Sequence, residues 1–338
     1  MAENKANHSN SKRAVQTAAQ AAGLPGSASG AAVLELDYVT KRIGGKTLVN
    51  GLSFQVGSGE IVGLLGPNGA GKTTTIRMIV GLISMSEGDI RIGGSSVRKQ
   101  FESAIRHIGA IIENPEFYPY MSGMDNLKQF MRMEGGVSEA RIREVSALVG
   151  LEDALHKKVK AYSLGMRQRL GIAQALLHKP KVLILDEPTN GLDPAGIREM
   201  RDYLKLIAEK EGIGILVSSH LLTEMELMCS RVVVIQEGKL LAVRTIKPDG
   251  SDESRQMSVS LEVTDAEQAA QHIAASSKAE LQGNDADGGR LIVKLAREDI
   301  PAIVKRLTDA GIGIYRIEEN KATLEDDFMK WTGGNRIA

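Results

Sequence analysis

Several features that would mark a secreted, membrane-spanning or charge-driven protein are missing from the sequence. Cysteine occurs once, as Cys229, so neither an intramolecular disulfide nor a multi-cysteine zinc site can form, which favours a reducing compartment. No apolar run approaches the roughly 20 residues that cross a bilayer, and we expect neither a membrane span nor a signal peptide. Lysine plus arginine and aspartate plus glutamate both total 42, so we expect no nucleic-acid partner held by overall basic charge.

The length and composition are those of a globular protein. A chain of 338 residues predicts about two domains, and 42% hydrophobic with 25% charged residues lies near the globular average. Residues 1–32 lack aromatics and are rich in small polar residues, which predicts a disordered arm. The polar, turn-rich stretch 245–257 predicts a linker. We therefore expect one domain over 33–244 and a smaller one over 258–338.

The order of strand-like and helix-like segments predicts the fold class. Alternating apolar residues at 33–39 and 52–56 indicate an antiparallel sheet at the start. Apolar runs at 61–65, 182–185, 215–217 and 232–235 alternate with helical patterns, which indicates a parallel sheet in an α/β domain. Beyond the linker, two amphipathic helices and several strands predict a small α+β domain. At about 80 residues it is near the lower size for independent folding, so support from the first domain or a second copy is expected.

The strongest motif follows the 61–65 strand. Residues 66–73 satisfy G-x-x-x-x-G-K-[ST] between a predicted strand and a predicted helix, a context that favours a phosphate-binding loop. Backbone N–H groups would surround the phosphates, Lys72 would reach the terminal ones and Thr73 would place its hydroxyl on Mg²⁺. A glycine-rich turn with a solvated lysine is the weaker alternative. The candidate nucleotide-binding residues here are Gly66, Pro67, Asn68, Gly69, Ala70, Gly71, Lys72, Thr73 and Thr74.

Two adjacent carboxylates end the 182–185 strand. The carboxyl ends of parallel strands are where such sheets bind ligands, so Asp186 is a candidate for Mg²⁺. Because neighbouring side chains of a strand point to opposite faces, Glu187 would be free to orient an attacking water. An acidic pair that merely caps a helix is the alternative, and the phosphate-binding loop makes it the weaker one.

The segment 162–170, Tyr-Ser-Leu-Gly-Met-Arg-Gln-Arg-Leu, resembles a variant of the signature of the ATP-binding cassette (ABC) family of ATPases. Ser163 can also be read simply as a helix N-cap. The resemblance implies a P-loop NTPase cassette with a RecA-like parallel core, an antiparallel β subdomain and a helical subdomain. It further implies ATP and Mg²⁺, and a head-to-tail dimer in which Ser163, Gly165 and Met166 close on nucleotide held by the other copy. The resemblance also implies that Asp193 belongs to the D-loop and that His220 contacts the γ-phosphate. The catalytic residues would then be Glu187, His220 and Lys72.

Two positions depart from the family pattern. Glu113 stands where most members carry glutamine, so the expected Q-loop is acidic; a carboxylate can still bind Mg²⁺, and the substitution resembles exporters linked to bacitracin or lantibiotic self-protection. Ile43 stands where an aromatic residue normally stacks on adenine, which predicts weakened selectivity for adenine over guanine. Tyr38 is expected in the core, unless a bulge lets it replace the missing aromatic.

An aromatic cluster follows Glu113. Phe117, Tyr118 and Tyr120 lie among several methionines and could form an adaptable groove for a helix of another polypeptide, or could fill the helical subdomain. The family receives its membrane subunit there. The resemblance thus implies a peripheral ATP-hydrolysing subunit at the cytoplasmic face of the membrane. It would act as a homodimer, or paired with a homologous ATPase, on a separate permease that exports peptide antibiotic or drug-like cargo.

Two other functions are compatible with the motifs. A soluble ABC ATPase that remodels a ribosome or a nucleic-acid complex is one, although such proteins usually carry two cassettes or a long coiled coil. A nucleotide-gated sensor without useful turnover, suggested by Glu113 and Ile43, is the other. The stretch 323–332 resembles the leucine-glutamate-aspartate tail of export cassettes, and its role in dimer support, regulation or stabilisation is left open.

Overall fold

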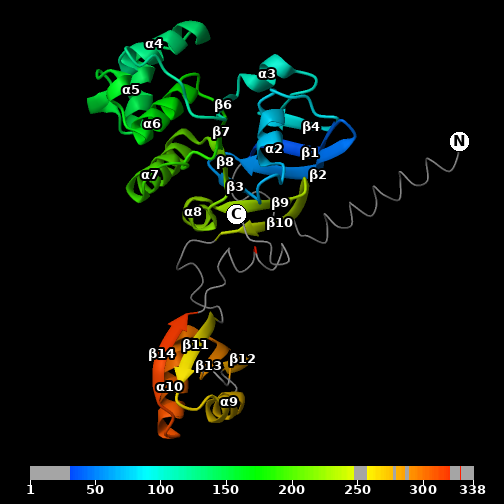
Figure 1. Ribbon diagram of the computed structural model, residues 1–338, viewed down its shortest axis with the longest axis vertical. Helices are drawn as coiled ribbons and strands as arrows, with labels where there is room; N and C mark the ends of the chain where they lie inside the picture. The colour runs from blue at the N-terminus through cyan, green and yellow to red at the C-terminus, as the bar shows by residue number, and fades with distance from the viewer. Residues whose placement is uncertain (1–30, 247–256, 277–278, 286–288, 320–327, 329–338) are drawn as a thin grey trace, which may run out of the picture. The chain divides into compact units, whose positions relative to one another are not determined.

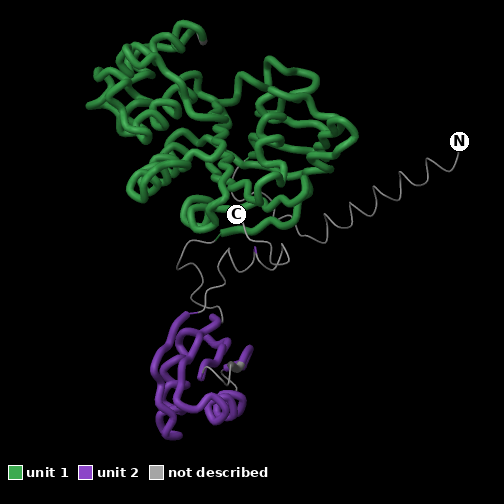
Figure 2. The backbone as a smooth tube through the Cα atoms, viewed as in Figure 1, with its two compact units in different colours: residues 1–246, 329–338 green, residues 247–328 purple. Residues whose placement is uncertain are grey.

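The computed structural model describes residues 31–246, 257–276, 279–285, 289–319 and 328. These residues fall into two compact units that divide after Ile246 (Figure 2). The predicted arm and linker lie outside the described residues except at their ends, where Ala32, Thr245 and Met257 are already in strands. The 323–332 stretch is described only at Phe328. The expectation that the smaller domain needs support from the first domain or from a second copy stays a prediction.

An antiparallel sheet opens the first unit, as the alternating sequence indicates. Its order is β2-β1-β4-β5, with β1 at Ala32–Ile43, β2 at Lys46–Gly57, β4 at Glu87–Ile92 and β5 at Ser95–Ser96. One face of β1 and β2 packs into a hydrophobic core shared with the neighbouring sheet. The pairing of β1 with both neighbours shifts register around Tyr38, so the strand is bulged there.

The second sheet of this unit has the order β10-β9-β3-β8-β7-β6. Its strands are β3 (Ile61–Leu65), β6 (Ile108–Ile111), β7 (Val182–Asp186), β8 (Gly214–Ser219), β9 (Arg231–Gln236) and β10 (Lys239–Thr245). All neighbours are parallel except β9 and β10. Every residue of β3 and β8 is buried, as expected for central strands covered on both faces.

Helices follow the carboxyl ends of three central strands. They are α2 (Lys72–Ile79), α7 (Pro194–Glu211) and α8 (Leu222–Met228), while α3 (Phe101–Ile105) lies beside β5. Just after α8, Cys229 is buried beside Met225, and burial raises the pKa of its thiol to about 12. Within the described residues, no helix combines the length and the apolarity needed to cross a membrane.

A group of helices connects β6 to β7 and stands to one side of the sheets (Figure 1). It contains α4 (Gly123–Glu134), α5 (Glu139–Leu148), α6 (Leu164–Ala175) and two short turns, η1 (Glu152–Ala154) and η2 (Val159–Ala161). Serine caps begin all three α-helices, and Ser122 forms a capping box with Asp125. Buried Arg141 of α5 joins this group to α7 through Glu211, with N–O distances of 2.8 and 3.1 Å.

The second unit is a four-stranded antiparallel sheet with two helices. Its elements are β11 (Met257–Val263), α9 (Ala266–Ala274), β12 (Ala279–Asp285), β13 (Arg290–Leu295), η3 (Arg297–Asp299), α10 (Ile300–Asp309) and β14 (Ile314–Glu319). The sheet order is β12-β13-β11-β14. Alternate residues of β11 and β13 pack with α9 and α10 in one core, so this is an α+β unit with a βαββαβ order.

Candidate functional site

The loop between β3 and α2 is shaped by glycines that approach other backbone segments. A Cβ atom on Gly66 would lie 2.3 Å from the carbonyl oxygen of Ile235, so no side chain fits there. Gly71 adopts φ 104°, and a Cβ atom on it would lie 3.0 Å from the carbonyl oxygen of Leu48. In this loop Asn68 is exposed and Ala70 is buried. The loop leads directly into α2, and the first N–H groups of a helix have no partner within the helix and can therefore face an anion.

Lys72 spans this loop. Its Nζ donates to the carbonyl oxygen of Gly66 at 2.6 Å and to that of Pro67 at 3.3 Å, and the side chain is buried. Burial lowers the pKa of Lys72, while the negative charges of Glu187 and Asp186 act in the opposite direction. The lysine and both carboxylates therefore lie within electrostatic reach of one another, as a shared phosphate site requires.

The two carboxylates are placed differently from each other. Asp186 is the last residue of β7, and one of its oxygens, Oδ1, accepts a hydrogen bond from the Ser218 hydroxyl of β8. Glu187 follows the strand in the left-handed region at φ 50°, with His220 Nδ1 only 3.3 Å from its Oε2. The predicted strand alternation at Glu187 is therefore wrong, because β7 has already ended at Asp186. The direction of the Glu187 side chain follows instead from its left-handed backbone, which is strained for a residue with a Cβ atom.

Oxygen ligands suited to Mg²⁺ come from two of the three predicted metal residues. Thr73 lies in the first turn of α2 beside Thr74, and Asp186 ends β7. A hydroxyl, a carboxylate, phosphates and water form the kind of ligand set that Mg²⁺ prefers. Glu113 instead pairs with Arg77 of α2 at 3.7 Å, so its predicted metal contact stays a prediction. In the described part of the chain, no group of three or more His, Cys, Asp or Glu could hold a metal alone.

Ser163 caps α6, accepting a hydrogen bond from the Met166 N–H at 3.2 Å. This helix start lies beside the predicted D-loop: a Cβ atom on Gly191 would be 3.1 Å from Leu164. Asp193 caps α7, accepting from the Gly196 N–H at 2.9 Å. A Cβ atom on Gly165 would make only ordinary contact, 3.6 Å from a Leu192 methyl group, so the fold of one chain does not explain that glycine. Helices α6 and α2 lie well apart in Figure 1, in different lobes of the unit.

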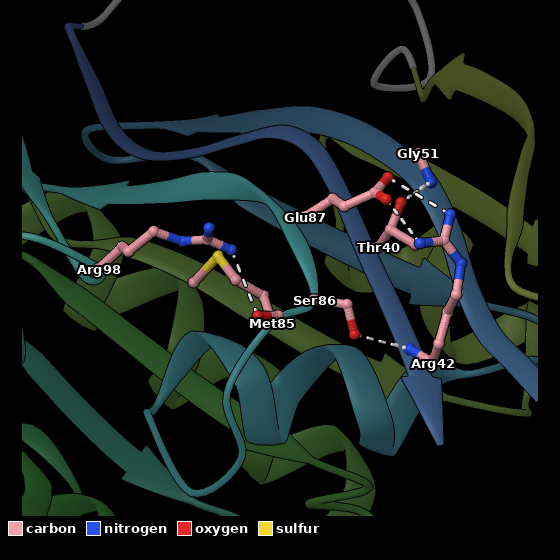
Figure 3. Close-up of polar contacts among 7 residues, drawn as sticks. All are labelled: Thr40, Arg42, Gly51, Met85, Ser86, Glu87 and Arg98. Carbon is pink, nitrogen blue, oxygen red and sulfur yellow. Dashed lines mark hydrogen bonds and ion pairs between the residues drawn. The ribbon is translucent and has the colours of Figure 1, made fainter. Parts of the chain in front are cut away.

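Ile43 is the last residue of β1, just before the turn to β2, and its exposed fraction is 54%. The Arg42 N–H donates to Ser86 Oγ at 3.0 Å, and its guanidinium pairs with Glu87 at 2.5 Å (Figure 3). These contacts fix the end of β1 against the connection from α2 to β4. Tyr38, by contrast, has φ 47° and is 43% exposed at the bulge, so its predicted place in the core is wrong.

The aromatic cluster after Glu113 divides between core and surface. Phe117 packs edge-to-face on Phe130 of α4, with ring centroids 6.5 Å apart. Tyr118 and Tyr120 lie beside each other with exposed fractions of 55% and 65%. On the same connection, an open depression of about 500 Å³ is lined by Arg77, Leu82, Ile83, Ile112 and Glu113. Phe117 is thus packed on the helical group, as one interpretation expects, whereas binding of a partner helix by Tyr118 and Tyr120 stays a prediction.

Comparison with known proteins relates these features to one family. A family model described as ABC transporter matches residues 49–190. The uncharacterized ABC transporter ATP-binding protein YhcH of Bacillus subtilis (strain 168) is 51% identical over 301 residues, covering 89% of this chain and 96% of that protein. The bacitracin transport ATP-binding protein BcrA of Bacillus licheniformis is 39% identical over 310 residues, covering 90% and 99%.

A solved structure agrees with the sequence relatives. The structure of an ATP binding subunit of an ABC transporter matches with a TM-score of 0.56 and 32% identity. The match covers 63% of this chain and 90% of that one.

Proposed function

Because the chain belongs to the ABC transporter family, as an ATP-binding subunit whose ATP hydrolysis is coupled to transport, we propose that it drives export of a peptide antibiotic or drug-like molecule. The resemblance read from the signature and the cassette fold are confirmed by the family match. The ribosome or nucleic-acid alternative has no support among the relatives described above. The cargo proposal is supported by the likeness to a bacitracin transport protein over nearly the full chain.

The observation that carries the proposed mechanism is the meeting of Lys72, Asp186, Glu187 and His220 at one edge of the sheet. The N–H groups of α2 and the Lys72 ammonium hold the phosphates once ATP replaces the carbonyl contacts of the lysine. Thr73 and Asp186 would hold Mg²⁺, which would supply positive charge to stabilise the phosphates. Glu187 orients the attacking water, and His220 restrains the Glu187 carboxylate and faces the γ-phosphate.

Completion of the site requires a second copy or a homologous ATPase. The capped start of α6 is an anion-binding helix terminus like that of α2, and the two lie in different lobes (Figure 1). In a head-to-tail dimer, Ser163, Gly165 and Met166 of each copy face the nucleotide of the other. The fit of a second chain also accounts for Gly165, which contacts little within its own chain.

The membrane subunit binds beside the Q-loop. Exposed Tyr118 and Tyr120 offer aromatic surface to an apolar helix, and the depression at Glu113 offers aliphatic surface. This surface supports the proposal that the chain is a peripheral subunit at the cytoplasmic face of the membrane. Since Glu113 lines the depression and pairs with Arg77 of the phosphate-binding helix, it joins the partner surface to the nucleotide site.

The purified full chain tests the catalytic assignment. We expect Glu187→Gln to lower ATP turnover at least about 100-fold, the range that loss of a general base produces, while ATP still binds. Glu209→Gln, the same change on an exposed residue of α7, is the matched control and should turn over normally. Wild-type turnover in Glu187→Gln would reject the assigned role.

A further inference from the structure

Ser218 occupies the centre of the candidate site without belonging to any motif singled out in the sequence. It is the residue before the last of β8, in register with Asp186 of β7 on one side and Leu64 of β3 on the other. Its side chain is completely buried. A buried hydroxyl must find hydrogen-bond partners, and the two partners of the Ser218 hydroxyl are Asp186 and Glu187, at the carboxyl end of β7.

The direction of each hydrogen bond is fixed by its partner. An ionised carboxylate can only accept, so the single hydroxyl proton of Ser218 is donated to Asp186 Oδ1. A backbone N–H can only donate, so Glu187 gives its N–H to Ser218 Oγ at 3.0 Å, while also approaching the Ser218 carbonyl oxygen at 3.2 Å. One hydroxyl therefore links the side chain of Asp186 to the backbone of Glu187.

Each bond has a consequence for the chemistry. The hydroxyl fixes one oxygen of Asp186 and so orients the carboxylate, leaving Oδ2 for a cation. The Glu187 backbone is in the left-handed region, which is unfavourable for a residue with a side chain and persists only where neighbours hold it. The shared N–H bond is such a restraint, and it aims the Glu187 carboxylate toward His220.

We infer that Ser218 is a positioning residue, whose hydroxyl sets the metal-facing carboxylate of Asp186 and the water-orienting carboxylate of Glu187 in one fixed relation. This inference rests on the proposed roles of those two carboxylates. Ser218 itself touches neither phosphate nor water. Its loss disturbs metal binding and turnover together, whereas ATP binding without metal is left intact.

Three substitutions separate the hydroxyl from the shape of the side chain. Ser218→Ala removes both hydrogen bonds. Ser218→Cys keeps nearly the same shape but offers only a weak S–H donor. Ser218→Thr keeps the hydroxyl and suits a strand, so it serves as the rescue variant. Ser230→Ala is the matched control, because Ser230 donates to the carbonyl oxygen of Ile61 at 3.1 Å, at the far end of β3.

The test measures binding of Mn²⁺, as a probe for Mg²⁺, to the ATP complex of the full chain by electron paramagnetic resonance. A Glu187→Gln background prevents hydrolysis during the measurement. We expect Ser218→Ala and Ser218→Cys to weaken Mn²⁺ binding about 10-fold or more, as loss of a partner behind a metal ligand does. Ser218→Thr and Ser230→Ala should bind Mn²⁺ normally, and ATP binding in EDTA should be the same in all variants.

The second measurement is ATP turnover, made in chains that keep the natural Glu187. Ser218→Ala should lower kcat about 10- to 100-fold with the loss partly recovered by raised Mg²⁺. The inference is overturned if Ser218→Cys binds Mn²⁺ as tightly as the natural chain, or if metal-free ATP binding falls as far as Mn²⁺ binding. Failure of the proposed function is seen separately, as normal turnover in Glu187→Gln with serine still at 218.

Discussion

At the scale of single residues, the site depends on side chains whose partners are set by register. Ser218 and Asp186 are 32 positions apart in sequence and become neighbours only because β7 and β8 pair in parallel. Glu187 has an unusual backbone angle that follows from the end of β7. These relations explain why the two carboxylates are held in place, although neither belongs to a rigid helix.

Ile43 gives a prediction about base selectivity. An exposed aliphatic side chain at the end of β1 offers adenine less stacking surface than an aromatic ring does. We expect Ile43→Tyr to raise the ratio of kcat/KM for ATP to that for GTP several-fold, on the order of the 0.5–1.5 kcal/mol of an aromatic pair. Steady-state hydrolysis of both nucleotides measures this ratio. Ile43→Leu, which adds no ring, is the control; an ATP preference in the natural chain equal to that of Ile43→Tyr would contradict the prediction.

The sequence predicted the positions of the candidate site residues better than their surroundings. Lys72 could be proposed because strand, loop and helix follow one another directly, and Asp186 because it ends a buried apolar strand. Ser218 could not, because its importance comes from a contact across the sheet. Tyr38 was expected in the core from alternation alone, and the bulge that turns it outward changes that alternation.

At the scale of elements, Arg141 is a buried polar connection between the helical group and α7. Besides Glu211, it contacts Glu144 at 3.0 Å and donates to the carbonyl oxygen of Leu176 at 3.0 Å. Helix α5 is thereby tied both to the end of α6 and to the end of α7. This buried guanidinium therefore helps to hold the signature helix against α7, together with Arg169 of α6, which donates to the Tyr203 hydroxyl at 3.1 Å.

Removal of that guanidinium should destabilise the first unit. Arg141→Ala leaves the largely buried Glu211 carboxylate unpaired, and we expect a loss near the lower end of about 3–5 kcal/mol in the free energy of unfolding. Urea titration followed by circular dichroism measures the loss. Arg143→Ala, on the exposed side of the same helix, should change stability by less than about 0.5 kcal/mol. Similar stabilities for the two variants would show that the buried pair contributes nothing.

Elements were predictable from sequence where they are long or strongly patterned. The buried strands β3, β7, β8 and β9 were, because each is a compact apolar run. Strand β12 was not predicted, because glycine, asparagine and aspartate interrupt its sequence pattern; its pairing with β13 is what defines it as a strand. Strand β6 has only four residues, which are too few to show the two-residue alternation that identifies a strand in a sequence.

At the scale of the whole molecule, the proposed sharing of each nucleotide between two copies predicts assembly. We expect Glu187→Gln to be a monomer without nucleotide and a dimer in saturating MgATP, with the cognate membrane subunit present if required. The phosphates are then held by both copies and are not hydrolysed. Size-exclusion chromatography with light scattering measures the mass. A hydrolysis-blocked chain that stays monomeric under all these conditions would refute the sandwich arrangement.

A pair of serine variants shows whether the signature helix makes the contact. In the Glu187→Gln background, Ser163→Arg should abolish the dimer while ATP still binds to the monomer. Ser138→Arg removes an equivalent cap from α5, where Ser138 accepts from the Arg141 N–H at 3.3 Å, and should leave the dimer intact. If both variants dimerise equally, the start of α6 does not lie at the interface.

The hydrogen bonds of Lys72 to the carbonyl oxygens of Gly66 and Pro67 also affect which anions the loop binds. Because the ammonium already donates to two carbonyl oxygens of its own loop, an anion that displaces these contacts gains affinity only by the amount by which its oxygens bind more strongly than the carbonyls do. A lone orthophosphate offers little surplus, whereas a polyphosphate ester reaches the lysine and the helix terminus at once. We therefore expect the loop to bind a nucleoside triphosphate in preference to the small anions around it.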